Sequence, residues 1–384
     1  MSRTAIARAT RLTAPTCFAI VEELLSMELV RCVATSRSSR GRPRAIYRFN
    51  PSAAFSIGVD ISGDSMVGVL IDLSGTVLET QRCLRPPLPE VQQVISWIAA
   101  MVENVRASGH IDPTRLAGIG VAVPALIDRA SGHVVRSTNL GWSDIPLARM
   151  LAEATGIEVY LENAARSIAL SERWFGAGRD AEHLACVNVG MGIGMALIIN
   201  GGLYTGADSQ SGELGHTVVE PDGPVCLCGR RGCLEAVASG RAILKTVVQA
   251  VREGRPSSVL SMAGGDPARI SLDMVVKAAD EGDSLCAETV RTAAFQIGLA
   301  VSNAITIVNP KMVVLSGSLI HSSRLVFESI SETIRGQAPV SPNALETAAV
   351  VRARYGPLAA AVGAAGVVHQ RRTGLYDGVR VVGA

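Results

Sequence analysis

Residues 57–75, IGVDISGDSMVGVLIDLSG, recur in outline at residues 185–202, ACVNVGMGIGMALIINGG. At a constant offset of 128 residues the two segments align without a gap, and Asp60 falls on Asn188. Each copy reads as a β-prone run, a glycine-bearing turn and a second β-prone run. A unit repeated in this way predicts a duplicated domain, with two lobes around a cleft that the paired turns face.

The sequence around the repeat supplies the other elements of an α/β fold. Apolar periodicity predicts helices at residues 90–107 and 240–253. The apolar runs LAGIGVAV (116–123) and KMVVLSG (311–317) predict further strands. The pattern is typical of the actin-like and sugar-kinase architecture, a duplicated ribonuclease-H-like fold.

These patterns divide the chain into three parts and a returning helix. They are a head at residues 1–50, a first lobe at 51–178, a second lobe at 179–356, and a helix near 357–370 that we expect to return to the first lobe.

Composition narrows the class of protein. With 384 residues, 48% hydrophobic and 18% charged, the chain can bury a large core. Its longest apolar run, about fourteen residues of CVNVGMGIGMALII, is too short for a membrane-spanning helix and is broken by glycines. The first residues carry arginines and lack the apolar core of a signal peptide. We therefore expect a cytoplasmic protein with no membrane partner.

Charge is unevenly distributed along the chain. Residues 1–50 contain nine arginines against Glu22, Glu23 and Glu28, a net charge of +6. Because the whole chain carries +2, the remainder carries −4. A basic head on a mildly acidic body indicates a polyanionic partner for the head.

The head has the pattern of a winged helix-turn-helix. Its first half reads as two helices joined by a turn, with Thr13 as N-cap of the second helix and Pro15 in that helix's first turn. Two β-prone pieces then flank a basic tip that contains RGRPR, residues 40–44. The first of the usual three helices is missing from this sequence, so the native start lies upstream or the head is incomplete.

We expect this head to bind operator DNA, with its second helix in the major groove and the tip in a narrow minor groove. The candidate DNA contacts are Thr13, Thr16, Arg40, Arg42 and Arg44. The alternatives are an ordinary helical hairpin with a solvated charged loop, and a flexible basic linker in place of the tip.

A histidine and three cysteines cluster in GELGHTVVEPDGPVCLCGRRGCLE, residues 212–235. In a reducing compartment such a cluster indicates metal binding or catalysis more often than disulfides. One imidazole and three thiols, His216, Cys226, Cys228 and Cys233, form a closed tetrahedral set suited to structural Zn²⁺. Free structural cysteines are the alternative.

These motifs resemble the ROK family, named for repressors, open reading frames and kinases, over about residues 2–370. The family's Glu-x-Gly-His and Cys-x-Cys-Gly-x-x-Gly-Cys-x-Glu elements are filled at every position, and the RGRP tip is similar to its regulator branch. The resemblance implies the same four zinc ligands. It also implies sugar contacts from Asn139, Asn163, Glu213, His216 and Glu235.

The resemblance fails at the catalytic base. Kinases of the family carry an Asn-Asp pair nine and eight residues before a glutamate, where the aspartate accepts the proton of the sugar hydroxyl. Here Asn163 stands nine residues before Glu172, but the base position is Ala164. The first phosphate turn, DISGDS, is also altered, and Asp64 would repel phosphate. The second turn, GMGIG at residues 190–194, keeps its glycines, which tight strand turns also use.

Retained sugar contacts without a base predict a sensor and not an enzyme. We therefore expect a transcriptional regulator, a repressor, that is a homodimer or homotetramer and responds to a sugar or sugar derivative. Three alternatives remain open: an ATP-dependent sugar kinase with an accessory head, a regulator controlled by a protein partner, and a pseudo-regulator that does not bind DNA.

Overall fold

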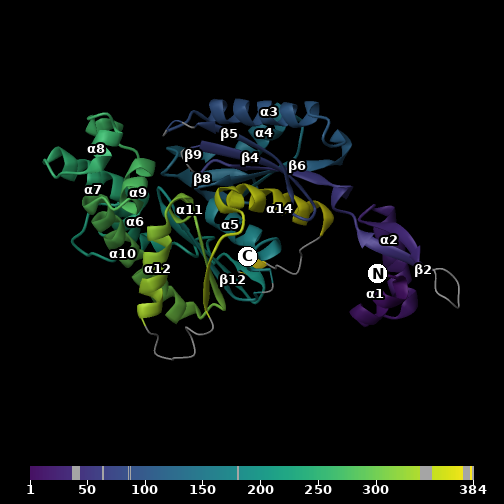
Figure 1. Cartoon of the computed structure of the whole chain (residues 1–384). Coiled ribbons are helices and arrows are strands. Elements are labelled where there is room, and N and C mark those ends of the chain that lie inside the picture. Colours follow the sequence, from purple (N-terminus) through teal and green to yellow (C-terminus); the bar gives the residue numbers. More distant parts are fainter. Residues whose placement is uncertain are drawn as a thin grey trace.

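The computed structural model describes residues 1–36, 44–62, 65–84, 86, 88–179, 181–337, 348–374 and 381–382. A small head stands to one side of a two-lobed body (Figure 1). Arg115 of the body contacts the head through an ion pair with Glu28 at 2.9 Å. It also donates to the carbonyl oxygen of Ser52, in the segment that follows the head.

The head consists of two helices and a two-stranded antiparallel sheet. These elements are α1 (Arg3–Thr10), α2 (Ala14–Ser26), β1 (Val30–Ser36) and β2 (Arg44–Phe49). The predicted cap is confirmed, since Thr13 accepts a hydrogen bond from the Thr16 amide and a proline follows in the first turn. The buried core is small and comprises Ala7, Cys17 and Val21.

Two larger sheets form the body, and their strands have the same order. The first sheet is β10 (Val159–Asn163), β6 (Leu116–Val123), β3 (Phe55–Asp60), β4 (Ser65–Asp72) and β5 (Val77–Leu84). The second is β15 (Ala349–Arg352), β14 (Met312–Ser316), β11 (Leu184–Val189), β12 (Ile193–Ile199), β13 (Gly202–Tyr204) and β16 (Val381–Val382).

The repeat found in the sequence corresponds to the central hairpin of each sheet. β3 and β4 pair antiparallel, as do β11 and β12, and a parallel strand flanks each hairpin. Asp60 is in register with Ala122, and Asn188 with Ser316. Each pair lies near the carboxyl ends of parallel strands, where ligands of α/β sheets bind. The duplicated α/β fold is therefore confirmed.

Helices and a small sheet complete the first lobe. They are α3 (Val91–Ala107), α4 (Leu147–Thr155), β7 (Leu126–Asp128), β8 (His133–Ser137) and β9 (Trp142–Ile145). The described residues also include short 3₁₀ helices, namely η1 (Pro51–Ala53), η2 (Pro113–Arg115), η3 (Leu214–His216), η4 (Pro267–Arg269) and η5 (Gly356–Leu358).

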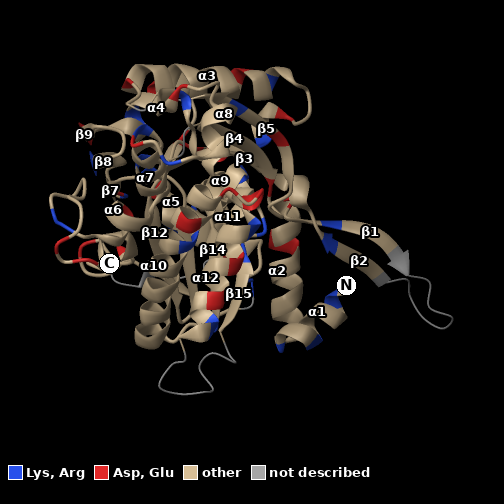
Figure 2. Cartoon of the chain, turned by 60° about the vertical axis from the view of Figure 1, so that its left-hand side comes forward, with Lys and Arg blue, Asp and Glu red and all other residues tan. Residues whose placement is uncertain are grey.

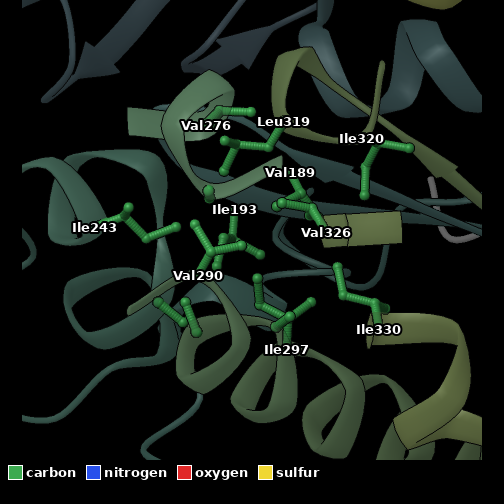
Figure 3. Close-up of a cluster of buried hydrophobic side chains, with 14 of the residues drawn as sticks. Val189, Ile193, Ile243, Val276, Val290, Ile297, Leu319, Ile320, Val326 and Ile330 are labelled. Carbon is green, nitrogen blue, oxygen red and sulfur yellow. The ribbon is translucent and has the colours of Figure 1, made fainter. Parts of the chain in front are cut away.

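The second lobe carries a larger helical layer. It comprises α6 (Leu234–Ala238), α7 (Gly240–Arg252), α8 (Ser258–Met262), α9 (Leu272–Asp280), α10 (Ser284–Val308), α11 (Ser318–Ser322) and α12 (Arg324–Gly336). Its aliphatic core joins the sheet residues Val189 and Ile193 to Val290 and Ile297 of α10 (Figure 3).

Helix α10 is long and apolar enough to cross a membrane by length and composition. One face of it, including Val290, Ile297 and Val301, is buried in the second-lobe core. A core helix of a globular lobe passes the same test of length and hydropathy, so the apolar character of α10 is accounted for by its packing.

The last helix of each lobe crosses to the other lobe. Helix α5 (Ala164–Trp174) follows the first sheet but packs on β11 and β12, although the sequence divided the lobes after residue 178. Helix α14 (Ala359–Thr373) follows the second sheet but packs on β3 and β6. The two helices lie side by side between the sheets (Figure 1).

Glycines make this crossing possible. A Cβ atom on Gly58 would lie 1.9 Å from the carbonyl oxygen of Ala361, and one on Gly120 would lie 1.9 Å from that of Ala364. A Cβ on Gly363 would lie 1.7 Å from the carbonyl oxygen of Ser167 in α5. These approaches leave no room for a methyl group, so α14 sits directly on the backbone of both neighbours.

We expect Gly120→Ala to lower the free energy of unfolding by about 1–3 kcal/mol, because the added methyl group must displace α14. Urea unfolding measures the change. Gly336→Ala is the matched control, since its Cβ would meet no atom within 4 Å. Equal stability of the two variants would contradict the close packing described here.

Candidate functional site

A cleft of about 1100 Å³ lies between the two lobes. Both hairpin turns face it, through Asp60 from the first lobe and Asn188 and Gly192 from the second. The five residues that the sequence nominated for sugar contact all line it: Asn139, Asn163, Glu213, His216 and Glu235. The structure thus brings together side chains that span about a hundred positions of sequence.

The histidine and three cysteines also converge. One ligand atom from each of His216, Cys226, Cys228 and Cys233 lies within 4.8 Å of all the others. The Cys226 amide donates to the carbonyl oxygen of Arg230, which closes a tight turn around Cys228. One imidazole nitrogen and three sulfurs at this spacing fit a tetrahedral metal ion.

Two features of the loop bear on metal binding. Burial raises the pKa of the Cys226 thiol and raises that of the Cys233 thiol to about 12, whereas at Cys228 hydrogen bonds from the backbone and side chain of Arg230 outweigh burial and bring the pKa to about 6. A thiolate is the form that binds metal. Gly232 has a φ of +66°, and a Cβ there would lie 1.5 Å from the carbonyl oxygen of Glu220, so the turn before Cys233 requires glycine.

His216 connects the metal site to the cleft. It ends η3, with Nδ1 3.6 Å from the Cys226 sulfur and Nε2 3.8 Å from a carboxylate oxygen of Glu213. A metal on Nδ1 leaves the Nε2 hydrogen directed toward Glu213 and the cleft. The metal would therefore fix the orientation of a cleft side chain.

Glu235 connects the metal loop to the second glycine turn. It lies in the first turn of α6, two residues after Cys233, and its carboxylate accepts a 2.9 Å hydrogen bond from the Ile193 amide. A Cβ on Gly192 would lie 2.6 Å from the same oxygen. A side chain at position 192 would therefore displace the Glu235 carboxylate, so glycine is needed there. The sequence alone did not indicate this role of Gly192.

Asn163 is occupied by its own chain. It is the N-cap of α5, where its side-chain oxygen accepts from the amides of Ala165 and Arg166. Its side-chain nitrogen donates to the carbonyl oxygen of Ala125 at 3.1 Å. One amide hydrogen remains for a ligand, so the structural role of Asn163 exceeds what the sequence indicated.

Asn139 lies between β8 and β9, at the edge of the first lobe. Its turn is held by Ser137, which donates to the carbonyl oxygen of Pro124 and accepts from the Leu140 amide. The same small sheet is tied to β10 by an ion pair between Arg129 and Glu162 at 2.9 Å, in which the side chains are 16% and 1% exposed.

Arg166 is a cleft residue that sequence reasoning missed. It is 7% exposed, and it donates at 2.6 Å to the carbonyl oxygen of Ser209, in the loop that leads to Glu213. Burial lowers the pKa of its guanidinium, which nearby Glu162 partly offsets. The only sequence signal was its place three residues after Asn163.

The catalytic base position contains no acid. Ala164 lines the cleft but is otherwise buried, at the start of α5. Glu172, the glutamate nine residues after Asn163 that located the base position in the sequence, is fully buried and accepts hydrogen bonds from the amides of Arg354 and Ala177. Burial raises the pKa of Glu172, although these hydrogen bonds oppose the rise. Asp64 of the first phosphate turn lies outside the described residues.

The predicted DNA contacts are described only in part. Thr13 and Thr16 lie at the exposed N-terminus of α2, with their hydroxyl oxygens 2.7 Å apart. Arg44 begins β2, whereas Arg40 and Arg42 lie outside the described residues.

Comparison with known proteins identifies the family of this chain. A protein-family model described as the ROK family matches residues 56–371. The xylose repressor of Bacillus subtilis strain 168 is 31% identical, over 87% of this chain and 82% of that protein. The transcriptional dual regulator NagC of Escherichia coli K12 is 30% identical, over 88% and 82%. A glucokinase of Thermotoga maritima is 34% identical, over 82% and 97%.

Two solved structures are similar over most of the chain. A ROK family transcriptional regulator, a homolog of the Escherichia coli MLC protein, has a TM-score of 0.80 and 25% identity, over 99% of this chain and 93% of that one. A ROK family glucokinase from Streptomyces griseus, with glucose and AMPPNP, has a TM-score of 0.74 and 28% identity, over 83% and 100%.

Proposed function

The chain belongs to the ROK family, and from this premise we propose that it is a DNA-binding transcriptional repressor whose cleft senses a sugar or sugar derivative without phosphorylating it. One observation carries the proposal. The cleft keeps Glu213, His216 and Glu235 together on one wall, while the base position is occupied by Ala164.

The sensor wall can recognise a polyol. Glu213 and Glu235 offer carboxylate oxygens, and His216 offers the nitrogen not taken by the metal. Sugar hydroxyls can donate to the two carboxylates, in hydrogen bonds worth about 1.5–3 kcal/mol each, and can accept from the Nε2 hydrogen of His216. An effector that bridges this wall and Asn139 on the opposite lobe would draw the lobes together.

Lobe closure can reach the head through the first lobe. Strand β6 ends beside the cleft, at Val123, and begins after Arg115, which pairs with Glu28 of the head. To switch the protein from mostly DNA-bound to mostly released, the effector must bind the closed state about 5.5 kcal/mol more tightly than the open state. A few hydrogen bonds formed only on closure can supply this preference.

The head is proposed to bind operator DNA as a winged helix-turn-helix, with α2 in the major groove and the 40–44 tip in the minor groove. Two heads are needed for two half-sites, so we infer a homodimer or homotetramer. The absence of membrane attachment and a cytoplasmic location also belong to this proposal.

An ATP-dependent sugar kinase is the second candidate, because the Thermotoga maritima and Streptomyces griseus relatives are named as glucokinases. Ala164 argues against it, since loss of a general base typically costs about 10²–10⁴-fold in rate.

We expect Glu213→Ala to bind operator DNA as the parent does but to lose most of the response to the effector sugar, by about tenfold or more in effector affinity, because one carboxylate contact is removed. DNA release is measured while a panel of sugars is titrated. Glu220→Ala is the control, since Glu220 is exposed seven residues later and does not line the cleft. An unchanged response in Glu213→Ala would refute the pocket assignment.

We propose that the metal is structural Zn²⁺, and we expect about one zinc ion per chain in metal analysis of freshly purified protein. Strong chelation should lower the melting temperature, because the ion would join the four side chains in addition to the backbone hydrogen bonds of the 216–233 loop. Cys228→Ser should lose both the zinc and the effect of the chelator. Zinc-free protein with the parent's stability would count against the site.

We expect no ATP-dependent phosphorylation of sugars above background, because a methyl group at position 164 accepts no proton. A coupled kinase assay over the same sugar panel tests this. Ala164→Asp should not restore turnover, because the first phosphate turn is also altered. Clear turnover by the parent would replace the sensor with the kinase.

A further inference from the structure

Helix α2, which is proposed above to enter the major groove, presents an exposed stripe of residues. Thr13, Thr16, Ile20 and Glu23 are all exposed, and they follow one another at spacings of three, four and three residues. Residues at such spacings lie on one face of a helix. Cys17 and Val21 are buried in the head and border the stripe on one side.

The charged residues around the stripe indicate that its N-terminal end approaches DNA. Arg8, in the last turn of α1, and Arg11, in the turn before α2, are exposed beside the N-terminus of α2. Glu23 lies at the far end of the stripe, where a carboxylate opposes approach to phosphates. In Figure 2 basic residues lie on α1, β1 and β2, and an acidic band crosses α2. The first half of α2 is therefore the part that can enter a groove.

The chemistry of that half is mainly apolar. Thr13 and Thr16 direct their hydroxyl oxygens toward each other at 2.7 Å, and Thr13 also accepts from the Thr16 amide to cap the helix. Ile20 is the largest apolar side chain of the stripe and is 39% exposed. In the major groove, the apolar feature that a branched aliphatic side chain can contact is the C5-methyl group of thymine.

We propose that Ile20 is a specificity-determining residue that reads thymine in each half-site through its C5-methyl group. The inference rests on the proposed DNA-binding function and adds to it the base that the helix selects. Thr13 and Thr16 set the start of α2, and Arg8 and Arg11 fix the register by contacts to phosphates.

Phe18 provides an internal comparison. It lies on the same helix and is 38% exposed, nearly the same as Ile20. However, it is two residues away, on a different face, where the guanidinium carbon of Arg3 lies 5.5 Å from its ring centroid. Arg3 also pairs with Glu22 on that side. Phe18 therefore belongs to the contact between α1 and α2, not to the stripe.

The experiment uses the full-length protein and DNA selected from a random duplex library. Each thymine of the selected site is replaced in turn by deoxyuridine, which removes only the methyl group from the major groove. For the parent protein we expect one thymine in each half-site at which the replacement weakens binding about fourfold, the value of one buried methyl group. Ile20→Ala should bind more weakly than the parent and be indifferent to that replacement, whereas Phe18→Leu should respond to it as the parent does.

The outcomes separate this inference from the function on which it rests. If no DNA sequence is enriched, the proposed DNA-binding function fails and the inference fails with it. If a site is enriched but no thymine is sensitive to loss of its methyl group, or if Ile20→Ala keeps the parent's sensitivity, the inference alone is overturned. Thermal unfolding of Ile20→Ala should match the parent, which excludes misfolding as the cause of weaker binding.

Discussion

The crossing of α5 and α14 is the constraint on which the body of this protein depends. Each helix leaves its own sheet and packs on the sheet of the other lobe, and the two meet at Gly363 against the backbone of Ser167. Because α14 also lies directly on Gly58 and Gly120, the first sheet cannot move without it. The lobes are therefore joined by a close backbone contact at glycines, and relative motion must occur around that contact.

The same crossing positions the cleft. Helix α5 begins at Ala164, directly after the last strand of the first sheet, and its N-cap Asn163 is tied to Ala125 of that lobe. Three residues later Arg166 reaches the loop before Glu213 in the second lobe. One turn of helix thus links groups on both walls. Movement of α5 would alter both walls at once, which is the property a ligand-driven switch requires.

The loop that carries the four candidate metal ligands borders the cleft. His216 faces the cysteines with one nitrogen and Glu213 with the other, and Glu235 anchors the end of the loop to the Ile193 amide. In the proposed regulator, a bound ion would hold these side chains without any part in chemistry. In that proposal the wall can bind a polyol although Ala164 stands at the position of a kinase base elsewhere in the cleft.

Features set by short segments of the chain could be predicted from the sequence, whereas most features set by contacts between distant segments could not. The sequence by itself predicted the duplicated strand–turn–strand unit, the Thr13 cap and the cluster of one histidine and three cysteines, because each of these patterns is contained in segments of about twenty residues. The alanine at the position of a kinase base was identified from the resemblance to the family. The sequence also predicted that the helix near 357–370 returns to the first lobe. Only the tertiary structure decided that α5 packs on the second lobe, that the side-chain nitrogen of Asn163 is taken up by Ala125, and that Arg166 and Gly192 belong to the site. Those features depend on contacts between segments distant in sequence, such as Gly192 with Glu235, and on hydrogen bonds whose acceptors are backbone atoms. A carbonyl oxygen has no residue identity, so no pattern of side chains along the chain can reveal which one will lie within reach.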